Sequence, residues 1–244
     1  MAKYAVIIPA AGKGERFGKS EKKTFAKLDG RPVFLRTVEH FINREDVCQT
    51  ILAVAPEDIE EMKSRYGANL GFMGVTLVEG GARRVDTVAA ALKKVSEDAE
   101  FVAVHDAARP CVLTSMIDAV FAEATKSGAA ILADPITGTV KKVGESKIIE
   151  ETVPRTSLYQ AQTPQVFRRD ILLESYSKIG ESEADVTDDA ELAERAGHAV
   201  SVIISDARNL KITTKGDLAL AAAILKAAPR KAVPRLGAFE EAQW

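Results

Sequence analysis

The chain has 244 residues, of which 46% are hydrophobic and 28% charged, which is the composition of an ordinary globular protein, and its formal net charge of −2 gives no reason to expect a polyanion partner. This length suits one α/β domain that carries an insertion. No apolar run approaches the roughly 18 residues of a membrane span, no leader-like segment precedes the first glycine, and two cysteines are too few for a disulfide framework, so we expect a cytoplasmic protein without membrane or nucleic-acid partners.

Five short apolar segments predict strands that are buried on both faces of a sheet. They alternate with segments in which apolar residues recur every three or four positions, as in amphipathic helices. The expected strands are 4–9, 50–55, 75–79, 101–106 and 129–134, and the expected helices are 33–43, 56–66, 83–95 and 114–128. The alternation predicts an α/β fold with a Rossmann-like, doubly wound, mainly parallel sheet, whose ligands bind at the carboxyl ends of the strands.

The pattern changes after residue 135. The stretch "GTVKKVGESKIIEETVP" predicts two short strands around a turn at 144–146. An isolated hairpin is marginally stable, so we expect this β-arm, at about 136–154, to pack on another surface such as a second subunit. The α/β pattern resumes through 168–179, 188–197, 199–205 and a last helix near 214–225. We place the domain at 1–228 and expect 229–244, rich in proline and charge, to be a flexible extension.

The loop after the first strand, "AAGKGERFGKSEKK", has the composition of an anion site. Ala10, Ala11 and Gly12 are small enough to let a ligand approach the backbone. Exposed amides and several cations, Arg16 and Lys23 among them, favour phosphate. The glycine spacing matches neither the P-loop nor the dinucleotide fingerprint, so this loop predicts a phosphate site of a different kind.

A second motif, "HDAARP", follows the strand at 101–106. Asp106 is placed to hold a divalent metal through oxygen, and Arg109 to meet a phosphate or to order the aspartate. We expect His105 to be structural, because its side chain alternates away from that of Asp106.

Three weaker signals complete the set. In "GGARRVDTV", Gly80 and Gly81 bring backbone close to a flat ligand, and Thr87 on the following helix is placed to hydrogen-bond it. Residues 163–165, Thr-Pro-Gln, predict a rigid turn. Lys211, at the end of a strand, supplies a positive charge.

In their order along the chain, these motifs resemble those of nucleotidyltransferases that couple a nucleoside triphosphate to a sugar or polyol phosphate. The series "PAAGKGERFG", "GGARR", "HDAARP", "PRTSLYQAQTPQVF", "VTDDAE" and "NLKIT" is similar to that of the 2-C-methyl-D-erythritol 4-phosphate cytidylyltransferase family of the non-mevalonate isoprenoid pathway. The resemblance implies a homodimeric enzyme, joined through its β-arm. It would transfer CMP from CTP to 2-C-methyl-D-erythritol 4-phosphate with Mg²⁺ or another divalent cation.

The resemblance also implies a role for individual residues. The base and ribose of CTP would be lined by Ala10, Ala11, Gly12, Gly81 and Thr87. The catalytic cations would be Arg16 and Lys23, on the triphosphate, and Lys211, on the α-phosphate. The acceptor would be bound by Asp106, which also serves the metal, with Arg109 and Thr187 of one subunit and with Thr139, Arg155 and Thr163 of the other.

Departures from the family pattern affect substrate preference rather than reaction type, and they include Gly138-Thr139 at the start of the arm and 187–189, Thr-Asp-Asp. Lys23 lacks the usual preceding proline, and Ala82 stands where an acid usually follows the two glycines. The nearest alternative is a ribitol 5-phosphate cytidylyltransferase, which shares the loop and the order of motifs. An NAD(P)-dependent dehydrogenase and a non-catalytic nucleotide-binding protein are the alternatives from other classes.

Overall fold

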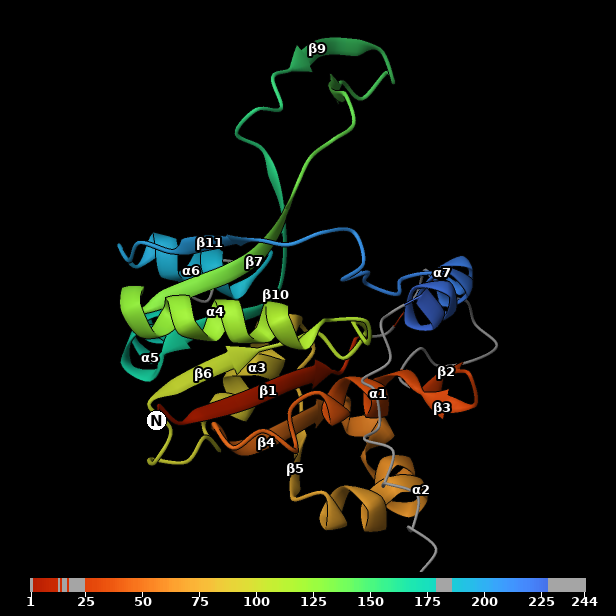
Figure 1. Cartoon of the computed structure of the whole chain (residues 1–244), viewed down its shortest axis with the longest axis vertical. Helices are drawn as coiled ribbons and strands as arrows, with labels where there is room; N and C mark the ends of the chain where they lie inside the picture. The colour runs from red at the N-terminus through yellow and green to blue at the C-terminus, as the bar shows by residue number, and fades with distance from the viewer. Residues whose placement is uncertain (1, 13, 15–16, 18–24, 179–185, 228–244) are drawn as a thin grey trace, which may run out of the picture.

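A seven-stranded sheet forms the centre of the molecule (Figure 1), in a computed structural model that describes residues 2–12, 14, 17, 25–178 and 186–227. Its strand order is β11-β7-β10-β6-β1-β4-β5. Neighbouring strands are parallel except at β10, which runs antiparallel to both β6 and β7. The strands of this sheet are β1 (Tyr4–Ala10), β4 (Val47–Val54), β5 (Val75–Glu79), β6 (Phe101–Val104), β7 (Ala129–Pro135), β10 (Tyr159–Arg168) and β11 (Ser201–Ile204). The mainly parallel sheet predicted from the sequence is confirmed.

Helices cover both faces of the sheet, as the doubly wound prediction requires. The helices are α1 (Val33–Glu39), η3 (Pro56–Asp58), α2 (Ile59–Phe72), α3 (Arg84–Leu92), α4 (Thr114–Ser127), α5 (Arg169–Ser177), α6 (Asp189–Arg195) and α7 (Lys215–Ala227). Alternate residues of β1 point to opposite faces: Val6 and Ile8 pack in one core with α1, α2 and α4. Ala5 and Ile7 pack in the other core with α3, α5 and α6. A buried strand therefore needs apolar side chains at every position.

The sequence analysis was wrong about residues 163–165, which are not a turn but part of β10. In the pairing of β10 with β7, Ala161 opposes Ala133 and Gln165 opposes Ile131, so three residues of β10 face one of β7. This is a bulge, and bulges accommodate proline, which has no N–H to give to a ladder. Pro164 did indicate an irregular backbone, but the irregularity is a bulge within a strand rather than the end of a strand.

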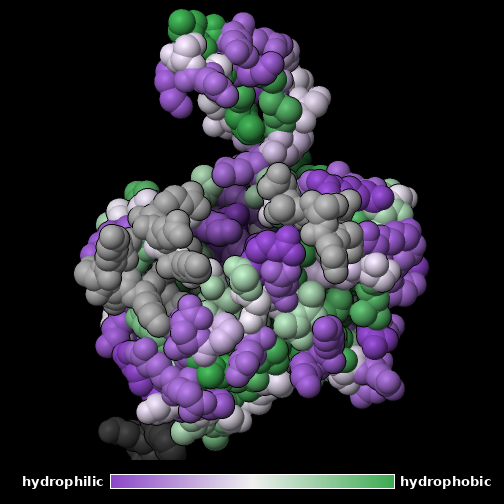
Figure 2. Space-filling view, turned by 180° about the vertical axis from the view of Figure 1, so that it is seen from behind, coloured by the Kyte–Doolittle hydropathy of each residue, from purple (hydrophilic) through white to green (hydrophobic). Residues whose placement is uncertain are grey.

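The predicted β-arm is present as a separate two-stranded sheet, β8 (Val140–Val143) with β9 (Ile149–Val153). It projects from the ends of β7 and β10, well away from the body of the molecule (Figures 1 and 2). Its surface carries the exposed apolar side chains of Val143, Ile148 and Ile149. A second small sheet, β2 (Lys27–Leu28) with β3 (Arg31–Pro32), packs with α7 in a minor apolar cluster.

Two expectations about the rest of the chain have different outcomes. No helix within the described ranges is long and apolar enough to cross a membrane. The division at residue 228 stays a prediction, because the extension at 229–244 lies outside the described residues.

Candidate active site

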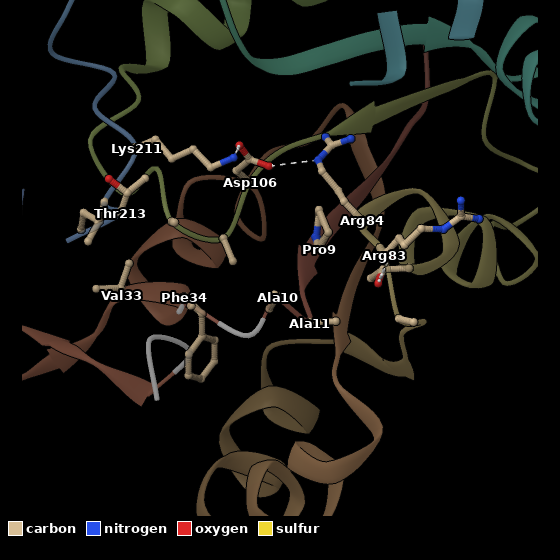
Figure 3. A pocket seen from close by; sticks show the side chains of 17 residues that line it. Pro9, Ala10, Ala11, Val33, Phe34, Arg83, Arg84, Asp106, Lys211 and Thr213 are labelled. Carbon is tan, nitrogen blue, oxygen red and sulfur yellow. Dashed lines mark hydrogen bonds and ion pairs between the residues drawn. The ribbon is translucent and has the colours of Figure 1, made fainter. Parts of the chain in front are cut away.

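A cleft lies at the carboxyl ends of β1 and β6, and the strands that follow these two in the chain lie on opposite sides of the pair. This switch in strand order is where doubly wound sheets bind ligands. The cleft holds about 560 Å³ (Figure 3). Its walls come from the end of β1, the start of α1, the start of α3, the turn after β6 and the segment before α7. The loop after β1, the segment after β5 and the turn after β6, which carry three of the sequence motifs, therefore meet in this cleft.

One wall of the cleft is made of small residues. Pro9, Ala10, Ala11 and Gly12 follow one another at the end of β1, and all four line the cleft. A Cβ placed on Gly12 would have no atom within 4 Å, so this part of the loop borders open space. Such a wall leaves backbone groups accessible to a flat ligand.

The two glycines after β5 are required by close packing against α3. A Cβ on Gly80 would lie 2.8 Å from Thr87 Cγ2 and 2.9 Å from Ala11 Cβ, and one on Gly81 would lie 2.4 Å from Asp86 Cβ. Thr87 Oγ1 accepts from Gly81 N at 3.1 Å and donates to the carbonyl of Arg83, 2.9 Å away. Thr87 lines the cleft, whereas Gly81 is not among the lining residues. These glycines thus hold the loop against the start of α3.

Asp106 is the centre of charge in the cleft. Its Oδ2 lies 2.7 Å from Lys211 Nζ and 3.5 Å from Arg109 Nε, and its Oδ1 lies 3.4 Å from Arg84 Nε. Burial opposes the charged carboxylate, but Lys211, Arg84 and Arg109 together hold the pKa of Asp106 far below its usual range. One carboxylate faces three cations, so this part of the cleft attracts anions.

Arg84 is a residue that the sequence analysis quoted but did not assign. Besides Asp106, its guanidinium donates to Asp189 Oδ2 at 2.7 Å, and Asp189 is fully buried at the start of α6. Tyr176 donates to the other Asp189 oxygen at 2.6 Å. Burial disfavours the cation, yet Asp189 and Asp106 raise the pKa of Arg84 above its usual value. Figure 3 shows Arg84 reaching Asp106 across the cleft.

A buried polar network positions Lys211, and no pattern in the sequence predicted this network. Arg109 Nη1 donates to the carbonyl of Asn209 at 2.6 Å, and the Asn209 amide donates to Gln162 Oε1 and to the carbonyl of Thr163, both at 2.8 Å. The network ties the segment before α7 to the turn after β6 and to the bulge in β10. Lys211 is thereby fixed beside Asp106.

His105 and Thr163 lie immediately behind Asp106, and both are buried. Thr163 Oγ1 accepts from Asp106 N at 3.0 Å and lies 3.1 Å from His105 Nδ1, while His105 Nε2 lies 3.1 Å from the carbonyl of Arg109. Burial lowers the pKa of His105 to about 3, so the imidazole is neutral. The structural role expected for His105 is confirmed.

The predicted site residues fall into four groups. On the cleft wall lie Ala10, Ala11, Gly12, Thr87, Asp106 and Lys211. Behind the wall lie Gly81, Arg109 and Thr163, the last two buried. Elsewhere lie Thr139 and Arg155, both exposed at the β-arm, and Thr187, whose hydroxyl donates to Glu191. Arg16 and Lys23 are outside the described residues.

A divalent metal would find one protein ligand in this cleft. Within the described ranges, no group of three or more His, Cys, Asp or Glu side chains is arranged to hold a metal. Asp106 Oδ2 contacts Lys211, whereas among the described residues Oδ1 has only the 3.4 Å contact with Arg84. Mg²⁺ commonly binds through one or two carboxylates together with substrate phosphates. The residues therefore fit an ion that arrives with a phosphorylated substrate, bound by Asp106 Oδ1.

Comparison with known proteins gives a consistent result over almost the whole chain. A family model described as 2-C-methyl-D-erythritol 4-phosphate cytidylyltransferase matches residues 4–227. A curated relative of that name from Rhodopirellula baltica is 43% identical over 236 residues, which cover 92% of this chain and 95% of the relative. The 4-diphosphocytidyl-2C-methyl-D-erythritol synthase of Anaerococcus prevotii has a TM-score of 0.78 at 28% identity, covering 92% of this chain and 99% of its own. The 2-C-methyl-D-erythritol 4-phosphate cytidylyltransferase of Francisella tularensis has a TM-score of 0.77 at 31% identity, with coverages of 91% and 100%.

The neutral, buried His105 predicts a loss of stability in mild acid. Its folded-state pKa lies below the unfolded value of 6.5, so the unfolded chain takes up the proton first as pH falls. Above about pH 7 the effect of His105 on the free energy of unfolding is constant. Between pH 7 and pH 5 the protonation of this residue in the unfolded chain should lower that free energy by about 2 kcal/mol. Urea unfolding of the wild type and of His105→Gln at several pH values measures it. In His105→Gln the decrease in unfolding free energy between pH 7 and pH 5 should be smaller by this amount. In His198→Gln, at a partly exposed histidine, it should be as large as in the wild type. Equal slopes for the wild type and His105→Gln would contradict a neutral His105.

Proposed function

The chain belongs to the 2-C-methyl-D-erythritol 4-phosphate cytidylyltransferase family, and we propose that it transfers CMP from CTP to 2-C-methyl-D-erythritol 4-phosphate in the formation of isoprenoid precursors. The observation that carries this function is the arrangement of Lys211 and Arg84 around Asp106, beside a cleft wall of small residues. Family membership removes the dehydrogenase alternative. A cytoplasmic location and the lack of a nucleic-acid partner stay predictions.

The nucleotide would lie along the wall formed by Ala10, Ala11 and Gly12, with Thr87 at its base end. Support comes from the size and openness of the cleft beside these residues. Ala82 also lines the cleft, and its methyl group offers no polar partner for a cytosine amino group. Selection of the base would then fall to backbone carbonyls.

The reaction joins two anions. An oxygen of the acceptor phosphate attacks the α-phosphorus of CTP, a new P–O bond forms, and the bond to the bridging oxygen of the β-phosphate breaks, releasing pyrophosphate. The nucleophile is already charged, so no protein base is needed. The protein has to orient both substrates and neutralise the developing charge.

Lys211 and Arg84 are the described cations best placed for this work. Asp106 contacts both, and its carboxylate holds the two cations in the lining of the cleft. When bound, a divalent ion would neutralise further charge on the triphosphate. Arg16 and Lys23, assigned by resemblance to the same task, lie outside the described residues, so their roles stay predictions.

The acceptor would be bound by Asp106 and Arg109, with Thr187 at the edge of the site. The second-subunit roles of Thr139 and Arg155 rest on the resemblance. They agree with the exposure of both residues and with the position of the arm, whose apolar side chains lack cover within the described chain.

The proposed reaction is tested by pyrophosphate release from CTP with Mg²⁺ and one of two acceptors. We expect release with 2-C-methyl-D-erythritol 4-phosphate and much less with ribitol 5-phosphate. The reverse preference would identify the ribitol enzyme. CTP binding without release in either reaction would indicate a non-catalytic nucleotide-binding protein.

Replacing Lys211 should lower turnover far more than CTP affinity. In Lys211→Met, the α-phosphate loses a charged partner in the transition state, and kcat should fall about 100-fold, which corresponds to roughly 3 kcal/mol. Lys93→Met changes an exposed lysine at the end of α3 and serves as the matched control. Steady-state kinetics with CTP as the varied substrate give both constants. A near-normal kcat in Lys211→Met would remove this residue from the reaction.

The β-arm should hold two subunits together through its apolar side chains. We expect light scattering to give the mass of a dimer for the wild type. Ile149→Glu, on the arm, should shift the protein towards monomer and lower its activity, because a charge is buried in the interface. Phe72→Glu, at an exposed apolar residue of α2, should do neither. A fully active wild-type monomer would overturn the second-subunit roles.

A further inference from the structure

A closed chain of hydrogen bonds joins the two ends of the turn that carries Asp106 and Arg109. From Asp106 N it runs to Thr163 Oγ1 at 3.0 Å and from there to His105 Nδ1 at 3.1 Å. From His105 Nε2 it reaches the carbonyl of Arg109 at 3.1 Å. Arg109 N also donates to the carbonyl of Asp106 at 3.0 Å. Two side chains, one directly after β6 and one in β10, thus fix both ends of a four-residue turn.

The chemistry of the partners fixes every direction in this chain. A carbonyl oxygen only accepts, so His105 Nε2 carries the proton and donates to Arg109. In a neutral imidazole the other nitrogen then has a lone pair, so Nδ1 accepts the hydroxyl proton of Thr163. The Thr163 oxygen in turn accepts from the amide of Asp106. The ring of His105 packs against Phe41, with centroids 5.3 Å apart, which adds an apolar contact to its orientation.

Thr163 has no hydrogen left to offer to a substrate. Its single hydroxyl proton is given to His105, one of its lone pairs is taken by Asp106 N, and the residue is 4% exposed. The bulge in β10 places it here, because three residues of β10 stand opposite one residue of β7. A residue that is buried and committed in this way does not suit a contact with ligands bound to another subunit.

We propose that Thr163 and His105 act within their own subunit as positioning residues for Asp106 and Arg109, and that Thr163 is not a ligand of the acceptor in the partner's site. This inference rests on the proposed function, in which Asp106 and Arg109 serve the acceptor. Thr163 acts through the backbone amide of Asp106, and His105 through the carbonyl of Arg109. The spacing of carboxylate and guanidinium then depends on the hydrogen bonds that His105 makes through both of its ring nitrogens.

Thr163→Val and Thr163→Ser separate this role from general stability. Valine has nearly the shape of threonine but leaves Asp106 N and His105 Nδ1 without partners, whereas serine keeps the hydroxyl. For Thr163→Val, kcat/KM for the acceptor should fall about tenfold to a hundredfold, while CTP affinity measured by calorimetry stays within about twofold. Thr163→Ser should retain most of the activity. Equal losses in both variants, or a loss that only follows the fraction of unfolded protein, would overturn the proposal.

Amide hydrogen exchange gives a readout that does not depend on activity. In Thr163→Val the amide of Asp106 should exchange at least about tenfold faster than in the wild type, and in Thr163→Ser nearly as slowly as in the wild type. Unchanged protection of Asp106 in Thr163→Val would overturn the proposal. The exchange measurement tests the proposal even if the wild type releases no pyrophosphate. That second result would contradict the proposed function and leave the roles of Thr163 and His105 in the turn unaffected.

Mixed dimers distinguish action within a subunit from action across the interface. Differently tagged Thr163→Val and Asp106→Asn chains are refolded together and the mixed dimer is isolated. If Thr163 serves its own Asp106, both sites of the mixed dimer are impaired and activity stays at the level of the parents. Recovery to about half of wild-type activity would overturn the proposal, because one site would then have regained every residue it needs.

Arg155→Ala is the matched control for the mixing experiment. Its mixed dimer with Asp106→Asn should recover activity, because Arg155 is assigned to the partner's site. Failure of this control alone would count against the role of Arg155. A monomeric wild type would exclude any role of Thr163 across an interface and would leave kinetics and exchange to decide its role in its own subunit.

Discussion

The charge on Asp106 is the constraint on which the rest of the site depends. Lys211, Arg84 and Arg109 come from three separate parts of the chain and all face this one carboxylate. Without it, three like charges would repel one another in a partly buried space, where charge interactions are stronger than in water. With it, the cleft keeps an excess of positive charge on side chains that are already in place, which is the condition for stabilising an anionic transition state.

Two of these cations have a second anchor. Arg84 is held by the buried Asp189 of α6, and Arg109 by the carbonyl of Asn209. The backbone beside Asp106 is held by Thr163. These contacts come from α6, from β10 and from the segment before α7, so the site is a property of the whole domain rather than of one loop. They also account for polar side chains that are buried without direct access to the cleft.

The sequence allowed the parallel part of the sheet, the arm and most of the cleft wall to be predicted, because continuous apolar runs and small residues after a strand have direct physical meanings. It did not reveal β10. A strand that begins with polar residues at the exposed base of the arm and contains a proline looks like a turn, and only pairing with β6 and β7 makes it a strand. Arg84 and Asp189 lie 105 positions apart, and no local pattern connects them. Asn209 and Gln162 were missed for the same reason.

The base of the arm closes on one pair of residues, Pro135 and Tyr159, which are the last matched positions of β7 and β10 before the chain leaves the body. The residues between Pro135 and Tyr159 form an insertion, and its length does not affect the pairing register of β7 with β10. The arm can therefore be lengthened, shortened or exchanged without moving Thr163, whereas a single residue gained between Tyr159 and Thr163 would turn the strand over. In an engineered chain, the length of the arm can accordingly be changed without altering the pairing of β7 with β10.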